Sequence, residues 1–197
     1  MKDEKLQEWL LARRQGITGT DVGKIMGVSK WGTIKDVYED KVFGKDIPDN
    51  ENMLWGRLLE PVILGEYARR NNTEYTTTDY IHRGQEEWQL ANVDGIAIET
   101  PIVLDNGDVV AKWKWGIEIK TSKSSKTFDP KIPPDYEYQC RWYMFVCNLD
   151  RWDLAALILG STYREFTILR DEKIEKEMVS KCRDFWFNYV VPRVQPS

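Results

Sequence analysis

Two stretches of the sequence decide the fold: Leu90-Ala91-Asn92-Val93-Asp94-Gly95 and Gly116-Ile117-Glu118-Ile119-Lys120-Thr121. In the first, a carboxylate ends an apolar run and a glycine follows it. In the second, charged and apolar residues alternate as they do along a β-strand, so Glu118 and Lys120 share one face. If the apolar face packs into the core, a carboxylate and an ammonium project together from the sheet.

This pattern predicts a magnesium site. Mg²⁺ takes oxygen ligands in octahedral geometry, usually one or two carboxylates with several waters. Asp94 and Glu118 supply the carboxylates, and the backbone carbonyl of Ile119 a further oxygen. Lys120 would orient an attacking water or stabilise developing phosphorane charge. The ordinary alternative is an exposed cross-strand ion pair after a turn, and the motif alone favours that alternative.

The sequence patterns around these two stretches predict helices in the first part of the chain, then a run of strands, and then strands and helices mixed. Periodicity and caps give an α/β or α+β arrangement around one sheet, in a single domain over 1–197 with a helical region at 1–72 and a catalytic region at 73–197. The expected helices are 3–14, a short one from about 18 to Met26, 33–43, 53–71, 135–147 and 171–190. The expected strands are 74–82, 87–93, 95–104, 108–120, 151–160 and 163–169, with loops at 45–52 and 129–134 and a turn at 105–107.

Charge and cysteine content bear on how the protein could bind DNA and on the redox state of its thiols. The net charge of −4 argues against a nonspecific basic DNA binder, although residues 112–131 form a locally lysine-rich stretch that suits a polyanion. A solvated loop explains that stretch equally well. Three cysteines without a CxxC pair predict reduced core thiols. The sequence shows neither a leader peptide nor a membrane span, so we expect a cytoplasmic protein.

Further motifs resemble one family. Asp94 followed by Glu118-Ile119-Lys120 resembles the bipartite motif of the PD-(D/E)xK nucleases, with Val93 where the name has proline. Three other segments are similar to the YqaJ-type viral recombinases, the lambda-type phage exonucleases. They are Arg14-Gln15-Gly16-Ile17-Thr18-Gly19-Thr20-Asp21, Trp55-Gly56-Arg57-Leu58-Leu59-Glu60-Pro61 and Tyr136-Glu137-Tyr138-Gln139-Cys140. The resemblance spans nearly the whole chain and implies a restriction-endonuclease-like core, with a central mixed sheet flanked by helices.

The resemblance also implies roles for individual residues. Glu60 would reach the metal directly or through water, although a carboxylate favoured by a helix dipole is the alternative. Gln139 would bond near the nucleophile, with Tyr136 and Tyr143 on the same helix face. Arg14 would bind a DNA phosphate, such as the 5′-terminal one, beside the Thr18–Thr20 turn. Arg13 is the competing candidate.

The basic residues after Asp94 have two interpretations. Lys112, Trp113, Lys114 and Trp115 alternate, so they would either stack on and steer DNA or form an edge strand guarded by lysines. Lys123, in the same basic stretch, is a further candidate DNA contact.

The resemblance implies an Mg²⁺-dependent DNA exonuclease, with Mn²⁺ able to substitute, acting 5′ to 3′ on linear double-stranded DNA in phage-type recombination. Relatives form trimeric rings and work beside a single-strand annealing protein, which implies a homo-oligomer here. Two alternatives remain: an endonuclease or nickase on the same core, and a non-catalytic DNA-binding module.

Overall fold

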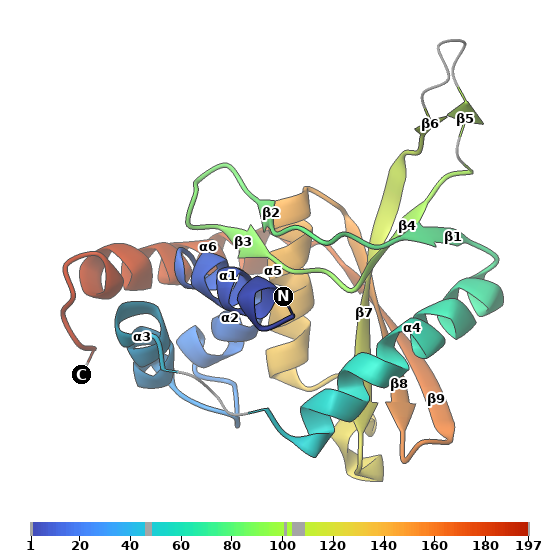
Figure 1. Ribbon diagram of the computed structural model, residues 1–197, viewed down its shortest axis with the longest axis horizontal. Helices are drawn as coiled ribbons and strands as arrows, with labels where there is room; N and C mark the ends of the chain where they lie inside the picture. The colour runs from blue at the N-terminus through green and yellow to red at the C-terminus, as the bar shows by residue number, and fades with distance from the viewer. Residues whose placement is uncertain (1, 46–48, 101, 104–108, 197) are drawn as a thin grey trace.

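A five-stranded mixed sheet forms the centre of the molecule (Figure 1). The computed structural model describes residues 2–45, 49–100, 102–103 and 109–196. The sheet has the order β1-β4-β7-β8-β9, and only the β7–β8 pair is parallel. Its strands are β1 (Glu74–Thr76), β4 (Gly95–Ile98), β7 (Trp113–Ser122), β8 (Arg151–Ile158) and β9 (Thr162–Leu169). Two short antiparallel pairs lie outside it: β2 (His82–Arg83) with β3 (Leu90–Ala91), and β5 (Ile102–Val103) with β6 (Val109–Val110).

Helices cover both faces of the sheet. The helices are α1 (Lys2–Arg14), α2 (Gly19–Ile25), α3 (Ile34–Phe43), α4 (Glu51–Asn71), α5 (Pro134–Cys147) and α6 (Glu172–Phe185), with a 3₁₀ turn η1 (Ser125–Phe128) and a π-helical turn η2 (Trp186–Val190). Helix α4 lies across one face, and α5 covers the other, with α1, α2, α3 and α6 grouped on its side (Figure 1). The predicted arrangement of a central mixed sheet flanked by helices is confirmed.

Alternation along the strands divides the core into two layers. Ile117 and Ile119 of β7 and Ala155 of β8 pack against α4, whereas Leu154 and Ala156 belong to the layer that contains α5. Glu118 and Lys120 therefore project on the α5 side, as the alternation predicted.

Helix α5 is the crossover between the two parallel strands. Parallel neighbours require such a connection, because a tight turn cannot join them. The crossover brings α5 over the sheet face that carries Glu118. The fold thus places the helix predicted to contribute Gln139 directly above the strand predicted to contribute the metal ligand.

Several predicted strands are shorter than expected. The predicted strand 74–82 divides in two: residues 74–76 pair with β4, residues 77–81 have no strand partner, and His82 begins β2, which pairs with β3. The predicted strand 87–93 reduces to β3, and the preceding Gln89 instead bridges Ile17 of the N-terminal segment. Similarly, 95–104 and 108–120 each divide into a strand of the main sheet and a strand of the β5–β6 pair. The predicted turn at 105–107 lies outside the described residues.

The helix boundaries also differ in places. Helix α4 begins inside the predicted 45–52 loop, where the Asn50 side chain caps it by accepting bonds from the Asn52 and Met53 amides. It continues through Pro61, which is exposed, so water can bond the carbonyl that loses its helical donor. At the C-terminus, the predicted helix 171–190 changes from α to π geometry after Phe185.

Two other expectations have clear outcomes. Cys140 and Cys182 are buried free thiols, and Cys147 is a partly buried one, as predicted. None of the helices in the described residues combines the length and apolar character needed to cross a membrane.

Candidate active site

The site forms where β4 and β7 separate. The antiparallel ladder between the two strands ends at the pair Gly95 and Ile117. Asp94, the residue before β4, is no longer paired with β7 through its backbone. The Asp94 carboxylate takes the place of a strand partner: its Oδ2 accepts a hydrogen bond of 2.8 Å from the Ile119 amide. In a β-strand the N–H and C=O of one residue point to the same edge. The Ile119 carbonyl therefore faces the Asp94 side of β7.

Glu118 lies beside this edge, on the α5 face, and is 1% exposed. Its Oε1 accepts hydrogen bonds from the Lys120 ammonium and from Gln139 Nε2, the latter at 2.8 Å. Its Oε2 is buried and has no hydrogen-bond partner among the described residues. A buried carboxylate oxygen without a donor is costly unless a cation or water binds it.

Three carboxylates share this region, and each has a raised pKa. Burial raises the pKa of Glu118 to about 8, and the negative charge of Asp94 adds to the effect. Burial and then Asp94 raise the pKa of Glu60, on α4, to about 7. Burial likewise raises the pKa of Asp94. The structure therefore brings all three predicted acidic residues within electrostatic reach of one another.

Lys120 offsets only a fraction of this negative charge. Burial alone would lower its pKa, but Glu118 and Asp94 outweigh burial and raise it, so the ammonium stays charged. Three carboxylates against one ammonium leave a surplus of negative charge when all are ionised. A divalent cation would remove that surplus.

The donor set fits a hard cation such as Mg²⁺ or Mn²⁺ rather than a metal that prefers sulfur or imidazole ligands. Within the described residues, no three histidine, cysteine, aspartate or glutamate side chains form a ready-made metal group. Two carboxylates, the Ile119 carbonyl and water are nevertheless the hard oxygen ligands and partial hydration that Mg²⁺ prefers. The unpartnered Oε2 of Glu118 is the atom that most clearly lacks such a ligand.

One face of α5 completes the site. Gln139 Nε2 lies 3.0 Å from the Tyr143 hydroxyl as well as bonding Glu118, and burial raises the pKa of Tyr143 well above its usual value. The Lys120 ammonium lies 5.0 Å from the centre of the Tyr136 ring. The predicted grouping of Tyr136, Gln139 and Tyr143 on one face is therefore correct, and all three touch the site or its ligands.

The N-terminal turn is pressed against the same helix. A Cβ on Gly19 would lie 2.4 Å from Tyr143 Cε1 and 2.9 Å from Gln139 Cγ, so only glycine allows this approach. The flanking threonines face Arg13, whose Nη2 lies 3.0 Å from Thr20 Oγ1 and 3.4 Å from Thr18 Oγ1. The turn thus places an arginine and two hydroxyls near the α5 face whose Gln139 bonds Glu118.

Arg14 points elsewhere. Its Nε lies 3.3 Å from Asp40 Oδ1, and its Nη2 donates to the Gly44 carbonyl at 3.1 Å. These contacts tie α1 to the end of α3. The sequence left open which of the two arginines would bind a DNA phosphate. The structure places Arg13 at the Thr18–Thr20 turn and Arg14 against α3.

A buried ion pair that the sequence did not reveal holds the turn. Asp21 completes a capping box at the start of α2 by accepting bonds from the Thr18 amide and hydroxyl. Its Oδ2 also lies 2.8 Å from Lys41 Nζ, whose side chain is 1% exposed. Lys41 donates in addition to the Arg13 carbonyl at 3.1 Å. No pattern marks Lys41, because it lies twenty residues from Asp21 among ordinary helix lysines.

Within the lysine-rich stretch 112–131, Lys120 lies at the carboxylates, whereas Lys112 and Lys114 contact other groups. Lys112 approaches Glu99 at 3.9 Å, and Lys114 lies 4.5 Å from the Trp115 ring centre. Trp113 and Trp115 begin β7 and pair there with β4 alone, because the ladder with β8 starts at Gly116, so the edge-strand interpretation holds for this first part of the strand. Lys123 is exposed just beyond the end of β7.

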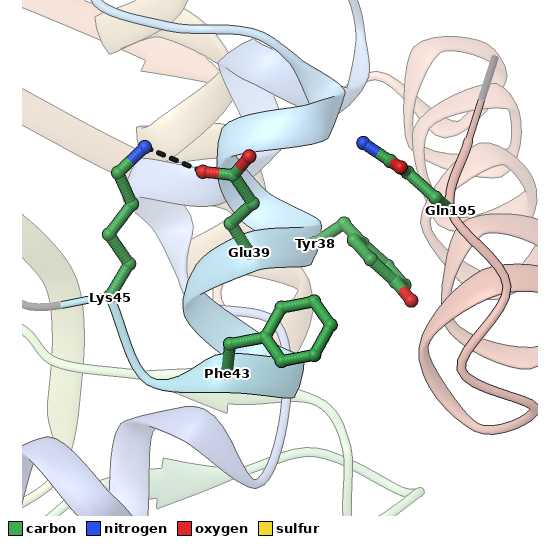
Figure 2. Close-up of a pocket in the computed structure, with 5 residues that line it drawn as sticks. All are labelled: Tyr38, Glu39, Phe43, Lys45 and Gln195. Carbon is green, nitrogen blue, oxygen red and sulfur yellow. Dashed lines mark hydrogen bonds and ion pairs between the residues drawn. The ribbon is translucent and has the colours of Figure 1, made fainter.

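A hollow lies away from this site, between α3 and the C-terminal segment. It has a volume of about 340 Å³ and is lined by Tyr38, Glu39, Phe43, Lys45 and Gln195 (Figure 2). The lysine lies 2.6 Å from the glutamate, so the two charges that face it already satisfy each other. None of the predicted site residues lines it.

Comparison with solved structures identifies the class of fold. An alkaline exonuclease from Laribacter hongkongensis, also solved in complex with dAMP, matches with a TM-score of 0.72 and 19% identity over 95% of this chain and 94% of that one. A phage related exonuclease from Haemophilus somnus 129PT matches with a TM-score of 0.62 and 13% identity over 90% and 96% of the chains. The chain therefore has a restriction-endonuclease-like fold, as predicted.

The family follows from the sequence match. The chain belongs to the YqaJ-like viral recombinase domain family, whose model matches residues 8–150. It is 27% identical to the uncharacterized protein YqaJ of Bacillus subtilis strain 168, over 96% of this chain. The match spans only 58% of that relative's length.

Proposed function

We propose that the chain is an Mg²⁺-dependent deoxyribonuclease that acts as an exonuclease on linear double-stranded DNA. The observation that carries the proposal is the meeting of Asp94, Glu118 and Lys120 where β4 and β7 separate. An unpartnered carboxylate oxygen and raised carboxyl pKa values indicate a site built for a cation. The family and the two exonuclease neighbours support a nuclease in phage-type recombination.

Asp94, Glu118 and the Ile119 carbonyl would hold the metal, with Glu60 contributing through water. When bound, Mg²⁺ supplies Lewis-acid stabilisation of phosphate and lowers the pKa of a bound water; Mn²⁺ can take its place. Lys120 stays cationic and is held by Glu118, so it can donate a hydrogen bond to the attacking water or to a phosphate oxygen. Gln139 fixes the orientation of Glu118 and contacts the same region.

Arg13 would bind the phosphate at the 5′ end of the strand, helped by the Thr18 and Thr20 hydroxyls. A guanidinium binds phosphate oxygens in a bidentate manner, and the hydroxyls here already face it. An anchor for a terminal phosphate next to the cation site would set 5′-to-3′ polarity. Lys112, Lys114 and Lys123 would contact the duplex farther from the reacting phosphate.

Digestion of matched DNA substrates tests the function. The protein is incubated with linear duplex, 5′-phosphorylated or not, and with covalently closed circular duplex, with Mg²⁺ or with EDTA. We expect metal-dependent loss of linear DNA and intact circles. Cleaved circles would indicate the alternative endonuclease or nickase, and binding without hydrolysis would indicate a non-catalytic DNA-binding module.

Two variants connect the activity to the site. Glu118→Gln and Asp94→Asn should each reduce Mg²⁺-dependent hydrolysis by about 10³-fold or more, because each removes a charged ligand of the cation. Both substitutions preserve side-chain size, so circular dichroism should match the wild type. Full activity in either variant would refute the ligand assignment.

Assembly and partners belong to the same proposal. We propose a homo-oligomer, a trimeric ring as the family resemblance implies, that works beside a single-strand annealing protein. Light scattering of the purified chain tests the oligomer, and co-purification with an annealing protein encoded near it tests the partner. A monomer at all concentrations would contradict the ring.

A further inference from the structure

Trp31 is an exposed aromatic side chain that the proposed chemistry does not use. It lies in the loop between α2 and α3 and is 67% exposed, which is unusual for the largest apolar side chain. The Lys30 ammonium lies 4.9 Å from the centre of its ring. An exposed indole with a neighbouring cation is the combination with which proteins bind single nucleic-acid strands.

The loop holds Trp31 in a fixed position. Its backbone amide donates to the Ser29 hydroxyl at 3.1 Å, and the amides of Val28 and Ser29 both donate to the Gly23 carbonyl. The loop begins at Gly27 with a φ of +74°, a conformation that glycine adopts without strain. The indole is therefore presented by an ordered turn that is bonded to α2.

A short series of contacts connects the indole to the carboxylate cluster. The Trp31 side chain lies close enough to the Tyr136 hydroxyl to oppose the rise that burial causes in the pKa of that phenol. The Tyr136 ring in turn faces the Lys120 ammonium, which binds Glu118. Phe128 stacks against the same phenol, with its ring centre 5.9 Å from that of Tyr136. Trp31 thus lies one phenol ring away from the lysine of the proposed reaction centre, on its solvent side.

We propose that Trp31 is the stacking platform for a nucleobase of the strand whose phosphate lies at the cation site, with Lys30 contacting the adjoining phosphate. This inference rests on the proposed function and names the residue that positions its substrate. A ring accepts any base, so it suits a nuclease without sequence preference. Trp31 would position the strand and take no role in the chemical step.

A scan with abasic nucleotides tests the platform. Affinities are measured by fluorescence anisotropy in the Glu118→Gln background, with Ca²⁺ in place of Mg²⁺, for duplexes with a short 5′ overhang. Each duplex carries one abasic site, moved one nucleotide at a time from the 5′ end. With Trp31 present, we expect one or two positions at which the missing base lowers affinity by about 10-fold, within the range for a stacked base.

The variants make the scan specific to this residue. In Trp31→Ala the dependence on abasic position should disappear, and normal DNA should bind about 10-fold more weakly. Trp31→Phe should recover most of the affinity and the same position. Phe43→Ala is the matched control, because Phe43 is an exposed aromatic that lines the hollow of Figure 2, and it should keep the wild-type scan.

Specific outcomes would overturn the proposal. An identical abasic scan with and without the Trp31→Ala substitution would refute stacking, while metal-dependent hydrolysis by the wild type would still support the nuclease. A smaller oligomer in Trp31→Ala with unchanged DNA affinity would show that the indole joins copies of the chain, which also refutes it. Failure of the wild type to bind DNA would overturn both the platform and the proposed function.

Discussion

At the scale of single residues, Glu118 combines conditions that are unfavourable without a ligand. It is almost fully buried, one oxygen is bonded to an ammonium and an amide, and the other has no donor among the described residues. Burial and the nearby Asp94 raise its pKa to about 8, so the folded protein holds the proton more tightly than the unfolded chain. These features fit a ligand to a cation better than a structural ion pair.

Lys120→Ala should depress turnover much more than substrate affinity. The ammonium is held inside the site by Glu118 and lies over Tyr136, where it can act on charge that develops only in the transition state. We expect kcat to fall by about 10²- to 10³-fold with KM changed by less than about 3-fold. Steady-state digestion of end-labelled duplex measures both constants.

Lys176→Ala is the control for that variant, because Lys176 is an exposed lysine on α6 paired only with Glu172 among the residues that the structure describes. It should change neither constant. A Lys120→Ala protein with raised KM and normal kcat would show that the lysine only tethers DNA.

At the scale of elements, alternation and spacing predicted the site better than the sheet around it. The Glu118–Lys120 face and the shared face of Tyr136, Gln139 and Tyr143 follow from local periodicity. The meeting of Asp94 with β7 and the role of Gln139 were expected from the order of the motifs and the family resemblance. Strand lengths did not follow from local periodicity, because a β-prone segment such as 77–81 becomes a strand only if a partner is available, and that depends on the whole fold. The Lys41–Asp21 pair and the different directions of Arg13 and Arg14 depend on how α1, α2 and α3 pack together, which no local pattern encodes.

Arg13→Ala should abolish any preference for 5′-phosphorylated ends, because Arg13 is the arginine at the Thr18–Thr20 turn. Arg14→Ala should keep that preference, since its side chain contacts Asp40 and the Gly44 carbonyl instead. The ratio of initial rates on phosphorylated and unphosphorylated ends measures the effect. The reverse pattern would show that Arg14 leaves α3 to bind the terminal phosphate.

Asp21→Asn should destabilise the N-terminal turn. It leaves the Lys41 ammonium buried without the Asp21 carboxylate, a change that typically costs about 3 kcal/mol or more. Chemical unfolding at pH 7 measures the loss, and Asp36→Asn, the equivalent cap of α3 at an exposed position, should cost less. Equal losses would mean that the buried pair adds nothing beyond the cap.

The same pair gives a defined pH dependence. Burial would raise the pKa of Asp21, but Lys41 and the Thr18 amide outweigh burial and lower it below its ordinary 3.8. The stabilisation is therefore fully present above about pH 4 and is lost as the pH falls through the lowered pKa. The difference in unfolding free energy between wild type and Asp21→Asn should shrink in that range. A constant difference down to about pH 2 would contradict this explanation.

At the scale of the whole molecule, the sheet and its two helical layers meet at one place. Helix α4 brings Glu60 from one side of the sheet, and α5 brings Gln139 from the other. Between them, the separation of β4 from β7 leaves Ile119 without a strand partner on that edge. A cation there would join the two layers through Asp94 and Glu118. The site is therefore a product of the entire fold, although its residues are recognisable from two short stretches of sequence.

The cation site can be tested directly with an anomalous difference map from crystals of the wild-type protein soaked in Mn²⁺. We expect a peak between the Asp94 and Glu118 carboxylates, at about 2.0–2.2 Å from their nearest oxygens and from the Ile119 carbonyl, and no such peak in Glu118→Gln crystals. A wild-type map without density between these two carboxylates, at a Mn²⁺ concentration that supports hydrolysis in solution, would show that they do not hold the metal.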